Sequence, residues 1–140
     1  MTPLGEMALE VERAGLQPRM IDGDDFAFWF TYQMVTIICY YDREDSVVGF
    51  ANVSAEAVPE GNRAEILSLC NRINRVSGCG NCYIMPCGNL VMQYRNRIRR
   101  KGDFRRLLGE ALESISGMKR EFLLAAMEKK ALDKDTYFKK

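Results

Sequence analysis

The sequence contains no histidine. Histidine is the commonest general base and metal ligand in proteins, so its absence excludes Ser-His and Cys-His nucleophile pairs and every histidine metal centre. The chain also has no glycine-rich phosphate loop, and its carboxylate pairs fall at turn positions. These absences predict no catalytic residues, no cofactor and no bound metal, and hence no enzyme.

Long apolar runs are also missing. The longest near-apolar stretches, FAFWF and MVTIICYY, are far shorter than the roughly 20 residues that a membrane-spanning helix needs. The first twelve residues hold three glutamates and no apolar core of signal-peptide length. Five cysteines, an odd number, are then most simply reduced thiols. Together these features predict a soluble, cytoplasmic protein with no membrane partner.

The net charge of +1 conceals an asymmetry along the chain. Residues 1–60 hold eleven acidic residues against three basic ones, and residues 61–140 hold eight acidic against seventeen basic. Opposed charges are expected to attract within the fold or across a dimer. With 140 residues, we expect a single domain over 1–140, with a core over about 4–127 and a charged tail at 128–140.

Hydrophobic periodicity predicts a first helix and three strands. Apolar residues at helical spacing predict a short helix that ends at Gly15, namely Leu4, Met7, Ala8 and Val11. Alternation and β-branched residues predict antiparallel strands at 26–32, 35–41 and 47–53, joined by a tight link at 33–34 and a polar turn at 42–46.

The second half predicts a helix, a hairpin and another helix. A helix from Asn62 to Gly78 would face the core with one apolar stripe, formed by Ile66, Leu69, Cys70, Ile73 and Val76. The segments NCYIM and LVMQY flank a Pro- and Gly-containing turn at 86–89, which predicts a hairpin. Asp103 is expected to cap a long final helix that frays after Lys129.

The predicted order is an α+β fold: helix, three-stranded antiparallel meander, helix, β-hairpin and long C-terminal helix. The segment LSLCNRINRVSGCGNCYIMPCGNLVMQYRNRI resembles the helix–hairpin signature of the YbjN-like family of proposed bacterial sensory-transduction regulators. In that signature, paired asparagines (here Asn71 and Asn74) precede a strand, a turn (here Gly88-Asn89) and a second strand. The upstream segment MIDGDDFAFWFTYQMVTIICYYDREDS is similar to the same family's acidic turns and aromatic strands.

The resemblance covers about residues 4–127. It implies the fold shared with type III secretion chaperones, which are typically dimeric and bind partner polypeptides, and it implies no catalytic residues. The expected function is therefore a non-catalytic protein-interaction or regulatory module, chaperone-like and homodimeric, that binds another polypeptide. The basic run after Tyr94 departs from the family, and the charge split differs from the acidic character of many secretion chaperones.

A Cys-x-x-Cys motif at Cys79 and Cys82 raises an alternative. A structural zinc site needs about four converging ligands, but Cys70 lies on the apolar stripe of its helix. Cys82 and Cys87 lie about 16 Å apart along an extended strand. A redox pair favours a first cysteine at a helix N-terminus, whereas this pair enters a strand. Structural thiols are favoured, and a small metal- or redox-active protein using Cys79 and Cys82 remains the alternative.

A basic run is the basis of a second alternative, a weak nucleic-acid binder. It spans 95–106 and comprises Arg95, Arg97, Arg99, Arg100, Lys101, Arg105 and Arg106. Arg95, Arg97 and Arg99 would alternate onto one face of a strand, where acidic residues on neighbouring strands could lie opposite. The run has no interleaved aromatic residues to stack on bases, and the near-neutral total charge does not favour nucleic acid as a partner.

The predicted sheet is apolar on both faces. One face would carry Phe26, Phe28, Phe30 and Tyr32, and Trp29 would lie on the reverse. The next two strands would also carry apolar residues on both faces. In one strand Ile37 and Cys39 lie on one face and Ile38 and Tyr40 on the other, and in the next strand Val48 and Phe50 lie on one face and Val47 and Val53 on the other. A sheet with helices on one side should have a polar reverse face. Either the first helix or the tail covers this face, or it is a dimer or partner interface. The favoured interpretation is an interface formed by Trp29, Ile38, Tyr40 and Phe50.

Overall fold

The structure, a computed structural model, describes residues 2–23, 25–100 and 102–138, with side chains up to residue 129. Its elements follow the order α1 (Pro3–Arg13), β1 (Arg19–Met20), β2 (Ala27–Tyr32), β3 (Val35–Asp42), β4 (Val47–Ala57), the 3-10 turn η1 (Glu60–Asn62), α2 (Arg63–Val76), β5 (Gly80–Ile84), β6 (Asn89–Arg97) and α3 (Asp103–Phe138). The predicted α+β fold and order of elements are confirmed.

The strands form one antiparallel sheet in the order β1-β2-β3-β4-β6-β5. The predicted meander is β2-β3-β4, and the predicted hairpin is β5-β6. Strand β1 was not predicted because a two-residue strand has no periodicity; it pairs Arg19 with Trp29 and Met20 with Phe28. Gln33 and Met34 have φ values of 49° and 67°, which give the tight two-residue turn that the twist of a β-hairpin favours.

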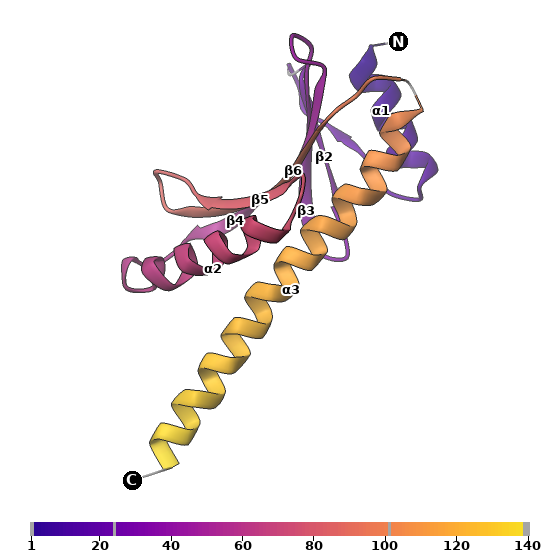
Figure 1. Ribbon diagram of the computed structural model, residues 1–140. Coiled ribbons are helices and arrows are strands. Elements are labelled where there is room, and N and C mark those ends of the chain that lie inside the picture. Colours follow the sequence, from indigo (N-terminus) through magenta and orange to yellow (C-terminus); the bar gives the residue numbers. More distant parts are fainter. Residues whose placement is uncertain (1, 24, 101, 139–140) are drawn as a thin grey trace.

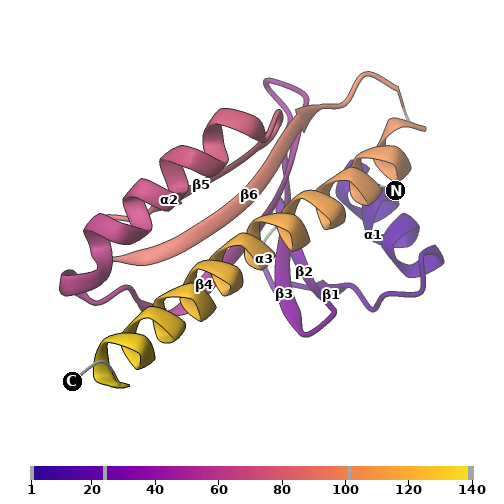
Figure 2. The same cartoon turned by 60° about the horizontal axis from the view of Figure 1, so that its bottom comes forward.

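All three helices pack on the same face of the sheet (Figures 1 and 2). Figure 1 shows that the sheet is strongly curved, so that the β5–β6 hairpin is turned away from β2 and β3. The core lies between this face and the helices, and its largest fully buried side chains come from four strands and two helices: Phe28, Phe30, Ile37, Cys39, Val48, Phe50, Cys82, Val11, Leu107 and Ile115.

The helix ends are set by local hydrogen bonds. Thr2 caps α1 by accepting from the backbone N–H of Gly5 at 3.1 Å, and Gly15 follows the helix with a φ of 87°. Asp103 begins α3, but its Oδ2 accepts from the preceding backbone N–H groups of Arg99 and Arg100, each at 3.0 Å. The predicted cap at Asp103 thus stabilises the linker before the helix, and these bonds lower the pKa of its carboxyl.

Two sequence predictions about these elements are wrong. Phe26 precedes β2 and is 63% exposed, whereas Phe28 and Phe30 are fully buried and Tyr32 packs partly buried against the core. Val76 is 84% exposed because it is the last residue of α2, beyond the sheet that covers Leu69 and Ile73. The helix α3 runs to Phe138, and the charged tail at 128–140 that frays after Lys129 stays a prediction.

Candidate protein-interaction face

The sheet face opposite the helices is here called the open face. In an antiparallel pair, residues directly opposite each other share a face, so the strand register identifies its members. They are Arg19 on β1; Ala27, Trp29 and Thr31 on β2; Thr36, Ile38, Tyr40 and Asp42 on β3; Val47, Gly49, Ala51 and Val53 on β4; Val91, Gln93, Arg95 and Arg97 on β6; and Asn81 and Tyr83 on β5.

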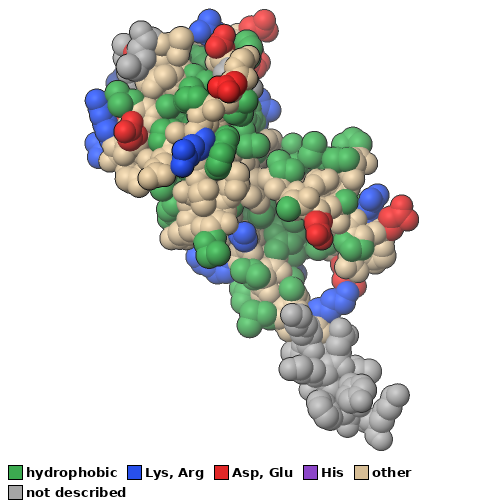
Figure 3. Space-filling model, turned by 180° about the vertical axis from the view of Figure 1, so that it is seen from behind, with side chains coloured by type: hydrophobic (Ala, Val, Ile, Leu, Met, Phe, Trp, Pro, Cys, Tyr) green, Lys and Arg blue, Asp and Glu red, His purple; other side chains and the backbone are tan. Residues whose placement is uncertain are grey.

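Apolar and aromatic side chains remain accessible on the open face. Trp29 and Val53 are each 38% exposed and Tyr83 is 43% exposed. Ile38 and Tyr40 are half-buried, although no described helix lies over their face of the sheet in Figure 1. Figure 3 shows hydrophobic side chains gathered on the lobe that carries the β5–β6 hairpin and α2.

The predicted interface set is therefore divided between two faces. Trp29 lies opposite Ile38, and Ile38 lies opposite Ala51, in one row across the open face. Tyr40 lies in the next row. Phe50 was wrongly grouped with them: it lies opposite Cys39 and is fully buried, because strand alternation puts it with Val48 on the core face. The role of Trp29, Ile38 and Tyr40 as an interface stays a prediction.

Tyr40 lies flat across two neighbouring strands. Its cross-strand partner is Gly49, and a Cβ at Gly49 would come within 2.0 Å of the Tyr40 Cζ. The Tyr40 hydroxyl donates to Gln93 Oε1 at 3.2 Å, and the Arg95 guanidinium lies 5.9 Å from the ring centroid. Burial raises the pKa of Tyr40, and the nearby Arg95 offsets part of this rise. The Tyr40 ring thus joins Gln93, through its hydroxyl, and Arg95, through its face, in one cluster on the open face.

The sequence signals for this cluster were incomplete. Gly49 could have been noticed, since a glycine inside a strand often marks a close approach. Gln93, which is only 9% exposed, is buried by contacts that no local pattern encodes.

The basic run does not form one continuous patch. Arg95 and Arg97 lie on the open face opposite Gly49 and Val47, so the expected acidic neighbours are not there. Arg106 pairs with Glu110 at 3.0 Å, within α3. Arg99 and Arg100 lie in the linker before α3, and Lys101 lies outside the described residues. The geometry thus separates the run between a sheet face, a loop and a helix.

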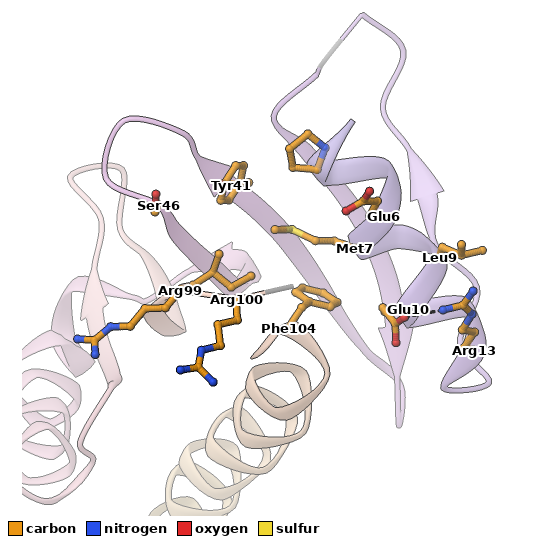
Figure 4. A pocket seen from close by; sticks show the side chains of 12 residues that line it. Glu6, Met7, Leu9, Glu10, Arg13, Tyr41, Ser46, Arg99, Arg100 and Phe104 are labelled. Atoms are coloured by element: carbon orange, nitrogen blue, oxygen red, sulfur yellow. Dashed lines mark hydrogen bonds and ion pairs between the residues drawn. The ribbon is translucent and has the colours of Figure 1, made fainter. Parts of the chain in front are cut away.

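A cavity of about 730 Å³ lies between α1, the β3–β4 turn and the linker before α3 (Figure 4). Met7, Tyr41 and Phe104 line it, with Arg99 and Arg100 from the linker and Glu10 and Arg13 from α1. Glu10 and Arg13 already form an ion pair at 2.7 Å. The cavity thus combines an apolar lining with an ion pair on α1.

The cysteines of the Cys-x-x-Cys motif have separate environments. Cys79 is exposed, whereas Cys82 is buried with Cys70. The Cys82 thiol lies 3.9 Å from the Cys70 carbonyl and 3.6 Å from Asn74 Oδ1, and burial raises its pKa to about 12. Among the residues that the structure describes, no three His, Cys, Asp or Glu side chains are grouped so that they could hold a metal ion.

Asn74 makes the most specific contact of this region. Its Oδ1 accepts from the backbone N–H of Cys82 at 2.8 Å, and its Nδ2 donates to the Cys82 carbonyl at 2.9 Å. Ser77 Oγ contacts the Gly80 carbonyl at 3.0 Å. Asn74 and Ser77 thus form hydrogen bonds with backbone groups at the outer edge of β5, in the place of a neighbouring strand. The sequence singled out Asn74 only through a resemblance.

The described helices include none that is long and apolar enough to cross a membrane.

Comparisons with known proteins bear on the fold. No family model matches this chain, and no curated protein does. Among solved structures, YbjN of E. coli, a proposed transcription regulator, matches with a TM-score of 0.66 and 13% identity over 79% of this chain and 83% of its own. A chain of the ExoU–SpcU heterodimeric complex of the Pseudomonas aeruginosa type III secretion system matches with a TM-score of 0.54 and 13% identity. The match covers 81% of this chain and 95% of that chain. The chain thus has the fold of YbjN and of type III secretion chaperones.

Proposed function

We propose that this protein is a non-catalytic protein-interaction or regulatory module, consisting of a single domain, that binds another polypeptide on the open face in a chaperone-like manner. The observation that carries the proposal is the accessibility of Trp29, Val53 and Tyr83 on a sheet face over which no described helix lies. Aromatic side chains on such a face are typical anchors of protein interfaces.

The structural similarity supports the same function. SpcU occurs in a heterodimeric complex with ExoU, so the fold is compatible with holding a second polypeptide. At 13% sequence identity, the two matches show a shared fold and do not identify the partner of this chain.

The proposal includes a homodimer, for which the distal part of α3 offers a second apolar surface. Leu123, Leu124 and Met127 are 58%, 46% and 65% exposed, and α3 continues beyond them to Phe138. We assign dimerisation to this surface, because pairing two open faces would bring arginines against arginines.

Capture with a tagged protein tests the proposal. Wild type is compared with two variants, Trp29→Glu on the open face and the matched control Leu124→Glu on α3, which each carry one new carboxylate at an exposed apolar position. A partner recovered by wild type and by Leu124→Glu but lost by Trp29→Glu supports binding at the open face. A folded Trp29→Glu variant that recovers the same partner contradicts it. Sedimentation of Leu124→Glu separately tests the dimer, which should dissociate.

A further inference from the structure

Resting on the proposed polypeptide binding at the open face, we propose that the segment bound there is acidic: a short extended stretch in which carboxylates alternate with apolar side chains. The apolar residues would contact the row of Trp29 and Ile38, and the carboxylates would contact the arginines of the same face.

The open face carries three arginines. Strand register puts Arg19 opposite Trp29, Arg95 opposite Gly49 and Arg97 opposite Val47, so all three share the face of Trp29. All three are exposed, and none forms an ion pair within the described part of the chain. A guanidinium without a protein carboxylate is a ready partner for an incoming one.

The only carboxylate at an open-face strand position is that of Asp42, among the positions that strand register assigns to this face. Its Oδ1 accepts from the backbone N–H of Glu44 at 3.0 Å, so it serves the β3–β4 turn. The strand positions of the open face therefore carry a positive balance, and a complementary partner is negative.

Arg95 is held in place before any partner binds. Its guanidinium lies over the Tyr40 ring, and the ring is held by its bond to Gln93 and by the close approach to Gly49. The stacked arrangement leaves the N–H groups at the edge of the guanidinium for a carboxylate, with less side-chain freedom to lose on binding.

Neighbouring charges favour a short peptide over a nucleic acid. Acidic residues border one end of the open face, in the loop before β2, at the end of β3 and in the β3–β4 turn: Asp22, Asp25, Asp42, Glu44 and Asp45. A phosphate backbone that continued past the arginines would meet these carboxylates, whereas a short peptide ends before them.

Trp29 gives a direct reading of binding, because it is the only tryptophan of the chain and lies on the open face. Its fluorescence would be followed during titration with four probes: a short peptide alternating glutamate with leucine, its glutamine and lysine counterparts, and an oligothymidylate. We expect the glutamate peptide to change the emission with an affinity that falls as salt is added. The other three probes should bind at least about tenfold more weakly.

Two double variants test the arginines with the same change in charge. Arg95→Gln with Arg97→Gln removes two charges from the open face, and Arg72→Gln with Arg105→Gln removes two from exposed positions of α2 and α3. With both folded by circular dichroism, the first should weaken the glutamate peptide about tenfold or more, and the second by much less.

Each other outcome overturns the acidic preference. The glutamine or lysine peptide could bind as tightly as the glutamate peptide, with affinities that Arg95→Gln with Arg97→Gln does not change. That result would support polypeptide binding at the open face and contradict a preference for acidic segments. Preferential binding of oligothymidylate would assign the face to nucleic acid. No response to any probe would overturn the acidic segment, while a partner captured through Trp29 would still support the proposed function.

Discussion

Asn74 on α2 holds the backbone of Cys82 on β5 through both its amide oxygen and its amide nitrogen, at 2.8 and 2.9 Å. An edge strand presents unpaired N–H and C=O groups that can recruit another strand. Asn74 satisfies both groups of Cys82, so this edge of the sheet is blocked by a side chain of the same chain.

Replacing Asn74 with alanine should therefore destabilise the fold. The variant leaves two backbone groups without their partner, and we expect a loss of about 2 kcal/mol in the free energy of unfolding. Asn71, which is exposed and has no hydrogen bond among the described contacts, provides the matched control; Asn71→Ala should change stability by less than about 0.5 kcal/mol. Urea unfolding measures both, and equal stabilities of the two variants would refute the role of Asn74.

The thiols should fall into two classes of reactivity. Cys79 and Cys87 are exposed, whereas Cys39, Cys70 and Cys82 are buried, and burial raises the pKa of all three buried thiols. Because the thiolate is the reactive species, Ellman's reagent should titrate two thiols rapidly in the native protein and all five after unfolding. Rapid reaction of Cys82, identified by mass spectrometry, would contradict its packing against α2.

Gly49 should be intolerant of a side chain, in contrast to Gly117. In Gly49→Ala the new Cβ meets the Tyr40 ring, so the ring must leave Gln93 and Arg95. We expect a loss of about 1 kcal/mol and weaker partner binding at the open face. A Cβ at Gly117 in α3 meets nothing within 4 Å, and Gly117→Ala should stabilise the protein by about 0.5–1 kcal/mol. Thermal unfolding compares them, and a more stable Gly49→Ala would contradict the position of Tyr40.

Tyr94 should make stability fall at high pH. Its hydroxyl donates to Glu110 on α3, and burial followed by this hydrogen bond raises its pKa to about 12 from an ordinary value of 10.0. The folded state favours the neutral phenol, so this contribution is complete below pH 10 and is lost as pH rises through about 12. Tyr94→Phe has no ionisable phenol at this position, so its free energy of unfolding should fall less at alkaline pH than that of wild type. Parallel stability profiles of the two proteins between pH 10.0 and about 12 would contradict the shift.

The fold was accessible from the sequence wherever a repeating pattern extended over several residues. The stripe of Leu69 and Ile73 identifies α2, and the alternation around Phe28 and Phe30 identifies β2. Patterns failed at ends, as for Phe26 and Val76, because periodicity does not show where the covering elements stop. Strand β1 is too short to have a period.

The candidate site was only partly accessible for a different reason. Alternation placed Trp29 on the face away from the core stripe, but the bond of Tyr40 to Gln93 joins residues 53 positions apart. Such a contact depends on which strands become neighbours, and β4 pairs with β6 rather than with the next strand in sequence. Arg95 was accordingly expected beside acidic residues, and it lies instead over an aromatic ring.

The central claim is that the open face binds a partner polypeptide, and Trp29→Glu tests it most directly. Sedimentation velocity of wild type and variant, each mixed with the purified captured partner, should show a complex for wild type only. Circular dichroism of Trp29→Glu should match wild type, because Phe28 and Phe30 on the core face are untouched. A folded variant that sediments with the partner as wild type does would contradict the claim. An unfolded variant would also contradict it, since Trp29 would then belong to the core.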